Sequence, residues 1–462
     1  MPDLTRYLRR VSFLLRQGDP VADVAVYLPT SDAWAHFTPG HVNLFEALRD
    51  RIGPDLLGAI SAAGYGFDLF DDEALARIGR INGNQLLLGR LAYRVVILPG
   101  VDRVPPATMR TLEAFARAGG IIVATRRIPD SAPGLRATAR EGAELREAAA
   151  RLFGPASPGH VIADERDGLA RLLRGSLRPD VRFTPAAPDV GFVHRRLPFA
   201  DVYFVANTSN VTVRTSAAFR VGRRGAESWD PMTGAVSAIV ADVRDADQVT
   251  LPFTLEPYAS RVVVFTERAL PALSRARGIR APAAISLADG WRLRFPDEPQ
   301  PRAAAPLRSW TEDDTRRYFS GVATYEREVR VPESLVRSGI GVQLDFGAAR
   351  AIPPEELERG MRAWLDAPVR EAAVVWINGA RVGSVWCPPY ALDVSQALHA
   401  GRNQIRIEVA NLAINAMAGR ALPSYRLLNA RYGTRFEPQD MDKVRPEPSG
   451  LLGDIRLVPF AR

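Results

Sequence analysis

The chain of 462 residues is poor in cysteine and in lysine, and each shortage excludes a class of function. Cys387 is the only cysteine, which excludes a disulfide framework, a CxxC metal knuckle and a redox pair of thiols. Lys443 is the only lysine, so arginine carries almost all of the positive charge behind the formal net charge of +8. The arginines are scattered among acidic residues and are not gathered into a basic stripe with interleaved aromatic residues. We therefore expect no nucleic acid among the partners.

The chain also lacks long apolar runs and the marks of an export signal. No stretch approaches the length of a membrane span, so we expect no membrane-spanning segment. Residues 1–20, "MPDLTRYLRRVSFLLRQGDP", lack the apolar core and the small-residue cleavage site of a signal peptide, and they are predicted to form an amphipathic helix. Its apolar face includes Leu8, Phe13, Leu14 and Leu15. Such a face needs a surface to pack on, which is a first indication of further sequence upstream.

Residues 21–185 alternate predicted strands and helices, the pattern of a parallel sheet. The segments "VADVAVYLP", "YRVVILPG" and "IIVAT" read as strands, and the second is a continuous apolar run of the kind that buried parallel strands require. A helix over Met109, Leu112 and Phe115 ends at Gly119. The segment therefore predicts a small doubly wound α/β domain.

Domains of this kind bind ligands at the carboxyl ends of their strands. There the sequence has "VDRVPP" and "RRIPDS", and neither contains a glycine-rich phosphate cradle or a Ser or Cys nucleophile with a nearby His. The domain resembles the glutamine-amidotransferase-like module without its nucleophile, and we expect a structural role for it. His36 and His41 frame "HFTPGH" after the first strand, but a metal site needs further ligands that the sequence does not reveal. Plain surface is the favoured interpretation, and a loop over the mouth of a neighbouring domain is the functional alternative.

Two β-rich segments follow, separated by a connector. Residues 186–270 contain short alternating strands with turn residues about every 8 to 12 positions, the spacing of a small β-sandwich. Residues 271–310 are rich in Pro and Arg and are predicted to be a connector, although "WRLRF" lies within them. Residues 311–462 form an all-β segment in which Ile405 and Ile407 alternate with polar residues, as in a half-buried strand. A helical insertion, "PPEELERGMRAWL", is predicted within this last segment.

The stretch "VVWINGARVGSVWCPPY" contains the clearest local signal. Asn-Gly between two β-rich runs predicts a type I′ turn, because both residues tolerate a positive φ. We therefore expect neighbouring antiparallel strands over 373–377 and 381–386, with Trp376 pointing into the core. Trp386 and Tyr390 lie beside two prolines at the far end, where they either fill the core or present a flat aromatic surface.

A longer run, "VVWINGARVGSVWCPPYALDVSQALHAGRNQIRIEVANLAIN" followed by "PSGLLGDIRL", resembles the galactose-binding-like jelly roll of family 2 glycoside hydrolases, although Asp454 stands where Pro is usual. Upstream, the segments "YLRRVSFLLRQGDPVADVAVYLP", "VVILPGV", "AGGIIVAT", "FADVYFVANTSN", "ESWDPMTG" and "LEPYASRVVVF" follow in an order that resembles the C-terminal half of glycoside hydrolase family 106, which contains α-L-rhamnosidases. The resemblance implies a mixed multidomain fold. It consists of an α/β doubly wound (glutamine-amidotransferase-like) domain, then a small β-sandwich, then a β jelly roll.

The resemblance also implies an α-L-rhamnosidase-type glycoside hydrolase whose catalytic barrel, with paired glutamates and a calcium ion, lies upstream of the matched part. No segment of this sequence matches that barrel, so no catalytic residue and no metal ligand is assigned, and no cofactor is expected in this chain. We expect a non-catalytic portion, inactive alone, that comes from a fragment, a split gene or a decayed relative. Its expected partners are the upstream barrel and a plant or microbial rhamnose-containing glycan, in an extracytoplasmic (periplasmic or secreted) location. The alternative is a free-standing carbohydrate-binding or interaction protein with no enzymatic partner.

Four side chains of the jelly roll are candidates for carbohydrate binding: Trp386, Tyr390, Asn378 and Asn411. Flat aromatic rings stack on the apolar C–H faces of sugars, and amides bind their hydroxyl groups. The competing interpretation is that these residues only support the fold, and it is slightly favoured.

Overall fold

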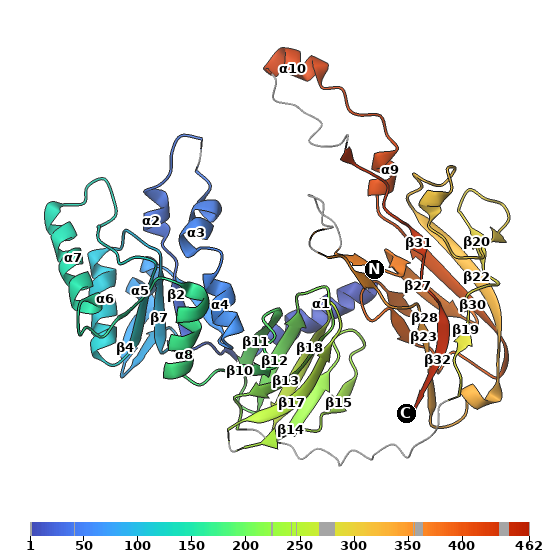
Figure 1. The fold of residues 1–462 in the computed structure, drawn as a ribbon, viewed down its shortest axis with the longest axis horizontal. Helices are drawn as coiled ribbons and strands as arrows, with labels where there is room; N and C mark the ends of the chain where they lie inside the picture. Colours follow the sequence, from blue (N-terminus) through green and yellow to red (C-terminus); the bar gives the residue numbers. More distant parts are fainter. Residues whose placement is uncertain are drawn as a thin grey trace. The chain divides into compact units, whose positions relative to one another are not determined.

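The computed structural model describes residues 2–40, 42–222, 225–241, 243–245, 247–267, 282–353, 355, 364–433 and 443–461. The chain forms two compact units (Figure 1), the first comprising Met1–Leu255 with Ser260–Leu273 and the second Glu256–Ala259 with Ser274–Arg462. None of the helices in the described ranges combines the length and the apolar character needed to cross a bilayer.

The first unit contains a parallel five-stranded sheet (Figure 1). Its strands, in spatial order, are β3 (Phe67–Phe70), β2 (Val24–Tyr27), β7 (Val95–Pro99), β8 (Ile121–Thr125) and β9 (His160–Ile162). β2 comes first in the sequence, with β3, the next, on one side and β7 on the other. The direction of the connections therefore reverses between β2 and β7, and this position is the topological switch point of the sheet.

Both faces of this sheet are buried, because successive residues of a strand point to opposite sides. Val24 and Val26 pack with helices α4 and α8 on one face, and Ala25 and Tyr27 pack with α6 and α7 on the other. The helices of this unit are α1 (Pro2–Leu15), α2 (Thr30–Trp34), α3 (Leu44–Ile52), α4 (Leu56–Ala62), α5 (Asp72–Ile78), α6 (Pro106–Arg117), α7 (Ala139–Phe153), the π-helical turn η1 (Glu165–Leu169) and α8 (Ala170–Ser176). A small antiparallel sheet, absent from the sequence prediction, comprises β4 (Gly79–Asn82), β5 (Gln85–Leu88) and β6 (Leu91–Tyr93). The sheet with helices on both faces is doubly wound, and β2, β7 and β8 are the strands predicted from the apolar runs.

Two antiparallel sheets complete the first unit, in the orders β1-β11-β12-β18-β14-β15 and β10-β13-β17-β16. Their strands are β1 (Asp19–Pro20), β10 (Val181–Thr184), β11 (Val190–Arg196), β12 (Ala200–Asn207), β13 (Val213–Phe219), β14 (Gly225–Trp229), β15 (Val236–Ala238), β16 (Val243–Arg244), β17 (Val249–Leu255) and β18 (Ser260–Thr266). Tyr203 of one sheet and Phe219 of the other share a core, with ring centroids 4.8 Å apart. β10 pairs with β13, so the α/β part ends before Val181 and not at residue 185.

Helix α1 packs on the outer face of the six-stranded antiparallel sheet. Leu14 contacts an apolar cluster formed by Ala200, Val202, Val262 and Val264. About two turns earlier in the helix, the hydroxyl groups of Tyr7 and Ser260 lie 2.8 Å apart. Leu8 and Phe13, in contrast, are 55% and 65% exposed. The predicted apolar face is therefore divided, because Leu14 packs within this unit while Leu8 and Phe13 stay at the surface.

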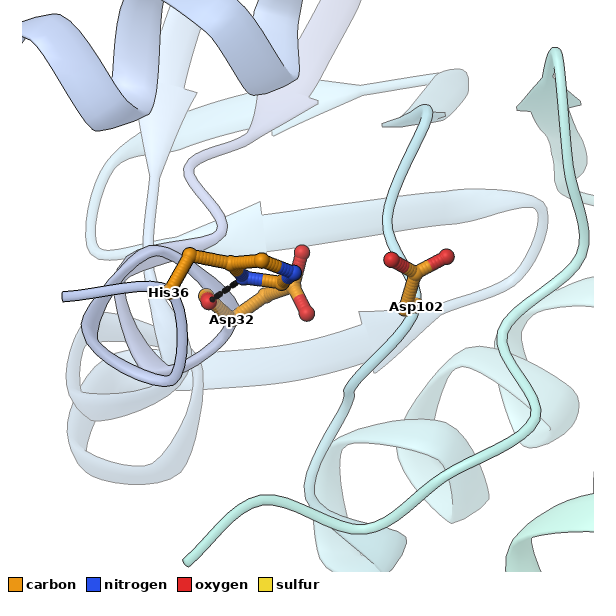
Figure 2. A group of neighbouring side chains, drawn as sticks. All are labelled: Asp32, His36 and Asp102. Carbon is orange, nitrogen blue, oxygen red and sulfur yellow. Dashed lines mark hydrogen bonds between the residues drawn. The ribbon is translucent and has the colours of Figure 1, made fainter. Parts of the chain in front are cut away.

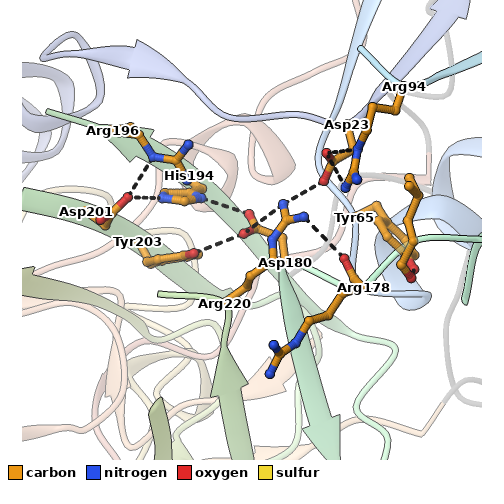
Figure 3. A network of polar contacts seen from close by, with 11 residues as sticks. Asp23, Tyr65, Arg94, Arg178, Asp180, His194, Arg196, Asp201, Tyr203 and Arg220 are labelled. Atoms are coloured by element: carbon orange, nitrogen blue, oxygen red, sulfur yellow. Dashed lines mark hydrogen bonds and ion pairs between the residues drawn. The ribbon is translucent and has the colours of Figure 1, made fainter. Parts of the chain in front are cut away.

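A buried polar network joins the paired sheets to the amino edge of the parallel sheet (Figure 3). His194 lies between two carboxylates, with Nδ1 2.9 Å from Asp180 Oδ2 and Nε2 3.0 Å from Asp201 Oδ1. Burial by itself would lower the pKa of His194, but its hydrogen bonds to Asp180 and Asp201 outweigh burial and raise that pKa. Burial would likewise raise the pKa of Asp201, but His194 and Arg196 lower it to about 2. We infer that His194 is an imidazolium that donates from both nitrogens.

Arg220 extends this network to the parallel sheet (Figure 3). Its Nη2 lies 2.6 Å from Asp23 Oδ2, directly before β2, and 3.5 Å from Asp180 Oδ1. Arg94, directly before β7, donates to the other oxygen of Asp23, with an Nη2–Oδ1 distance of 3.1 Å. Every carboxylate of the network therefore pairs with at least one cationic side chain. These ion pairs connect the α/β part of the first unit to its paired antiparallel sheets.

The second unit consists mainly of two antiparallel sheets that share one core, in the orders β21-β20-β22-β30-β27-β28 and β19-β32-β23-β29. Their strands are β19 (Ile285–Ser286), β20 (Arg292–Arg294), β21 (Arg302–Ala303), β22 (Val322–Val331), β23 (Ile340–Asp345), β27 (Ala372–Ile377), β28 (Ala380–Val385), β29 (Ala391–Asp393), β30 (Gly401–Ala410) and β32 (Arg456–Ala461). The remaining elements are η2 (Trp310–Glu312), η3 (Glu333–Leu335), β24 (Arg350–Ala351), β25 (Leu365–Asp366), β26 (Val369–Arg370), α9 (Ile414–Ala418), α10 (Arg426–Tyr432) and β31 (Gly450–Leu451). Most of the predicted helical insertion lies outside the described residues.

The predicted connector over 271–310 is wrong from Ile285 onwards, because β19, β20 and β21 belong to the two sheets. Trp291 and Phe295 are buried in the core of the second unit, at 1% exposure each. The Pro- and Arg-rich composition concealed short strands whose aromatic residues fill that core.

The hairpin predicted from Asn-Gly is confirmed. β27 and β28 pair antiparallel, and Asn378 and Gly379 have φ values of 51° and 81°, as a type I′ turn requires. The prediction that Trp376 points into the core is wrong, because Val375 and Ile377 occupy that face. Trp376 is half-buried on the other face, where the guanidinium carbon of its cross-strand partner Arg406 lies 4.6 Å from a ring centroid.

Candidate functional site

Three side chains with metal- or proton-binding groups meet at the carboxyl edge of the parallel sheet (Figure 2). After β2 the chain enters α2, which carries Asp32, and His36 follows that helix. After β7 the chain turns at Gly100, and Asp102 follows. One nitrogen or oxygen atom of each of the three side chains lies within 4.8 Å of the other two. The segments that leave the strands on either side of the switch point therefore converge, as they do at the ligand sites of doubly wound sheets.

Asp32 is the buried member of this group, with no exposed surface. Its Oδ1 accepts two hydrogen bonds from Arg103, from the backbone N–H at 3.1 Å and from Nη1 at 3.3 Å. Its Oδ2 has no hydrogen bond within the described residues, and Arg51 Nε is 3.7 Å away, beyond hydrogen-bond range. A buried carboxylate oxygen without a donor is unusual, and it marks a place where another group can bind.

His36 is exposed, and its tautomer is fixed by the helix before it. Its Nδ1 lies 2.8 Å from the backbone carbonyl oxygen of Asp32, which can only accept, so Nδ1 carries the proton. In the neutral ring, Nε2 is then left with its lone pair. Figure 2 shows this hydrogen bond and the imidazole beside the Asp32 carboxylate.

Asp102 is held from two sides by arginine. Its Oδ1 accepts from Arg127 Nη1 at 2.7 Å and its Oδ2 from Arg51 Nη1 at 3.3 Å. Together with Arg103 on Asp32, two carboxylates are surrounded by three guanidinium groups. These ion pairs hold the acidic side chains in place, and any additional cation must compete with arginine for them.

Sequence reasoning singled out His36 at this edge but neither carboxylate. His41, its predicted companion, lies outside the described residues. Asp102 falls in "VDRVPP", which was set aside because it contains no phosphate cradle and no nucleophile. The missing signal was the strand order, because only the adjacency of β2 and β7 brings Asp32 and Asp102 together.

The two asparagines proposed for sugar binding make hydrogen bonds within the second unit. Asn378 Nδ2 donates to Asn403 Oδ1 at 2.8 Å, and Asn378 Oδ1 accepts from the backbone N–H of Gln404 at 3.0 Å. Asn411 Nδ2 donates to Ser449 Oγ at 3.0 Å and to a backbone carbonyl at 2.8 Å. Both amides therefore hold turns and strand ends together, and their binding of a sugar stays a prediction.

The two aromatic candidates differ in exposure. Tyr390 is 7% exposed and belongs to the core of the second unit, and burial raises the pKa of its hydroxyl to about 12. Trp386 is only half-buried. Trp386 is therefore the more accessible of the two aromatic candidates, and a role in sugar stacking stays a prediction.

Comparison with known proteins connects the chain to a family of enzymes. Residues 2–242 match glycoside hydrolase family 106, described as alpha-L-rhamnosidase. A solved rhamnosidase from Novosphingobium sp. PP1Y has a TM-score of 0.70 and 25% identity, over 99% of this chain and 41% of that chain. A putative beta-glucuronidase from Formosa agariphila is 26% identical over 261 residues, which make up 56% of this chain and 20% of that protein.

The two matches to individual proteins each cover a larger share of this chain than of the protein to which it is compared. This chain spans about a fifth of the length of the curated relative and about two fifths of the solved rhamnosidase. The family match covers more than half of this chain and includes α1, the parallel sheet and most of the paired sheets. The chain therefore belongs to glycoside hydrolase family 106, the alpha-L-rhamnosidase family.

Proposed function

We propose that this chain is a non-catalytic portion of an α-L-rhamnosidase-type glycoside hydrolase, and that it supports the catalytic domain of that enzyme. The observation that carries the proposal is the unequal coverage in the rhamnosidase comparison, 99% of this chain against 41% of that chain. The greater part of that rhamnosidase has no counterpart in this chain.

The carboxylates of the described residues support this proposal. Hydrolysis by a carboxyl pair needs a general acid of raised pKa and a second carboxylate about 5–9.5 Å away. The buried acidic side chains are Asp32, Glu113, Glu165, Asp180 and Asp201, and each is paired with Arg or His. The hydrogen bond from Arg151 lowers the pKa of Glu113, which is the opposite of what a general acid needs. Burial raises the pKa of Asp72 and of Glu371, but the Asp72 carboxylate accepts hydrogen bonds from Tyr27, Ser31 and Thr108, and Glu371 is paired with Arg370.

A supporting role also fits the second unit, which we propose is a galactose-binding-like jelly roll. Two antiparallel sheets around one core and the Asn-Gly hairpin support that assignment. The amides of Asn378 and Asn411 stabilise this unit, which favours scaffolding over sugar binding for these two residues.

The test is an activity assay with and without a catalytic domain. The purified chain is incubated with an aryl α-L-rhamnoside and, in parallel, with other aryl glycosides, and release of the phenol is followed. We expect no turnover by the chain alone, and a stable complex in size-exclusion chromatography with a separately produced family 106 catalytic domain. Turnover that survives repurification of the chain would refute the proposal. Failure to form a complex would favour a free-standing protein.

A further inference from the structure

We propose that Asp32, His36 and Asp102 form a binding site for a divalent transition-metal ion such as Zn²⁺ at the switch point of the parallel sheet. The inference is independent of the proposed supporting role, because it rests on the side chains of the first unit alone. Two carboxylates and one imidazole are a donor set that zinc and its neighbours in the first transition row accept.

The geometry brings three ligand atoms close to coordination distance. One atom from each side chain lies within 4.8 Å of the other two. Three ligands spread around one ion at zinc bond lengths of about 2.0–2.2 Å lie no more than about 3.8 Å from one another. Side-chain rotations that bring these atoms about 1 Å closer together therefore close the site around an ion.

The unsatisfied oxygen of Asp32 is the second observation that points to a ligand. This carboxylate has no exposed surface, and its Oδ2 accepts no hydrogen bond from any described residue. Oδ1 is fixed by the backbone N–H of Arg103, so the carboxylate cannot turn away from the site without losing that bond. An ion would satisfy the open oxygen, which is in place before the ion arrives.

His36 is prepared for metal binding by its own hydrogen bond. Imidazoles that bind metals commonly donate their other N–H to a carbonyl or a carboxylate, which fixes the ring and raises the basicity of the ligating nitrogen. Here Nδ1 donates to the carbonyl oxygen of Asp32, and the exposed ring gives an ion access from solvent. The imidazole also excludes calcium as the preferred ion, because calcium takes oxygen ligands.

Three arginines determine how tightly the site can bind an ion. Arg51, Arg103 and Arg127 pair with the two carboxylates while the ion is absent, which leaves one positive charge in excess. The side chain of Arg127 is 50% exposed, so it can turn into solvent when an ion takes its place. Binding is therefore a competition between the ion and guanidinium, and loss of one guanidinium should strengthen it.

The test is calorimetric titration of the untagged full chain with zinc chloride. We expect one ion per chain, binding weakened about tenfold or more in His36→Ala and Asp102→Asn, and binding strengthened in Arg127→Gln. His160→Ala, which removes another exposed histidine of the same sheet, is the matched control and should bind as the wild type does. Because Asp32 holds the backbone at Arg103, the exposed His36 is the safer variant, and circular dichroism checks that it folds.

A second readout locates the ion. Zinc should raise the melting temperature of the wild type but not that of His36→Ala, because an ion that binds the folded state alone stabilises it. Zinc binding that His36→Ala leaves unchanged would place the ion elsewhere and overturn the proposal. Absence of binding in both the wild type and Arg127→Gln would overturn it as well.

Discussion

The amino edge and the carboxyl edge of the parallel sheet differ in how completely their buried polar groups are hydrogen-bonded. At the amino edge, His194 donates to two carboxylates, and the neighbouring Asp23 is held by two arginines. At the carboxyl edge, Asp32 is equally buried, yet its Oδ2 has no hydrogen bond within the described residues, and neither does the buried hydroxyl of Thr125 at the end of β8. We call the amino edge closed, because its buried charged groups have hydrogen-bond partners, and the carboxyl edge open, because two buried polar atoms there have none within the described residues. A closed network stabilises the fold, whereas open polar groups mark the place where a ligand can complete the bonding.

The largest expected effect comes from opening the closed edge. Replacing His194 by Ala leaves Asp180 and Asp201 buried without the cation between them, and we expect a loss of about 3–5 kcal/mol in the free energy of unfolding. The matched variant His36→Ala, at the open edge, should change it by no more than about 0.5 kcal/mol. Urea denaturation followed by circular dichroism measures both. Equal losses in the two variants would remove the distinction between the edges.

The second unit allows a similar comparison between a buried aromatic residue, Tyr390, and a half-buried one, Trp386. Tyr390→Ala removes a core side chain and should cost about 3–5 kcal/mol, whereas Trp386→Ala should cost clearly less. Thermal melts of the two variants rank them. If Trp386→Ala also abolishes binding of a rhamnose-containing glycan without lowering the melting temperature, the predicted sugar site gains support. Retained binding in that variant would exclude Trp386 as the stacking surface.

The pH dependence of stability tests the closed edge without mutation. The pKa of His194 is raised in the folded chain, so its contribution to stability is complete below the ordinary histidine pKa and is lost as the pH rises through the folded value. The pKa of Asp201 is lowered to about 2, so its contribution is present above about pH 4 and is lost as the pH falls toward 2. Each unit of difference is worth about 1.4 kcal/mol. Urea midpoints measured across the pH range should show the alkaline decline in the wild type, and its persistence in His194→Ala would assign it to another group.

Asp32→Asn, at the open edge, should lower the stability less than the matching change at the closed edge. The amide oxygen can still accept from the backbone N–H of Arg103, and the two arginines that lose their charge partner, Arg51 and Arg103, are partly exposed to water, so the loss in the free energy of unfolding should stay below about 3 kcal/mol. Asp201→Asn, at the closed edge, is the control and should cost more, because it takes one of two charge partners from His194, whose side chain has no exposed surface. Urea denaturation measures the free energy of unfolding of both variants. A larger loss in Asp32→Asn than in Asp201→Asn would mean that the carboxyl edge is closed by bonds not yet recognised.

The elements that could be predicted from the sequence are those whose signal is local. The apolar runs fixed β2, β7 and β8, and Asn378-Gly379 fixed the hairpin, because a turn depends on the conformations of its own residues. Trp376 was misplaced because both faces of its strand are apolar in sequence, and packing gave the inner face to the β-branched neighbours. The short strands between 285 and 303 were not predicted because they have only two or three residues each, too few for a periodic pattern, and β19 and β20 pair with the distant strands β32 and β22.

Neither polar cluster could be predicted from local sequence patterns, and the physical cause is the same for both. Asp180, His194 and Asp201 lie on different segments and meet only through the pairing of β11 with β12 and the turn into β10. Asp32 and Asp102 meet only because β7 lies next to β2. A histidine in the sequence is visible as a candidate, but the carboxylates that define its chemistry are assigned by topology.

The packing of α1 has a consequence for the order in which the chain folds during synthesis. Tyr7 and its partner Ser260 are separated by 253 positions, so the helix emerges from the ribosome long before the strand on which it packs. At about 5–20 residues per second, α1 waits roughly 10–50 s with its apolar side uncovered. Contacts between such distant positions slow folding, because the loop between them must close first. We therefore expect the α/β part, whose strands follow one another closely, to fold first during translation, and α1 to join the paired sheets at the end.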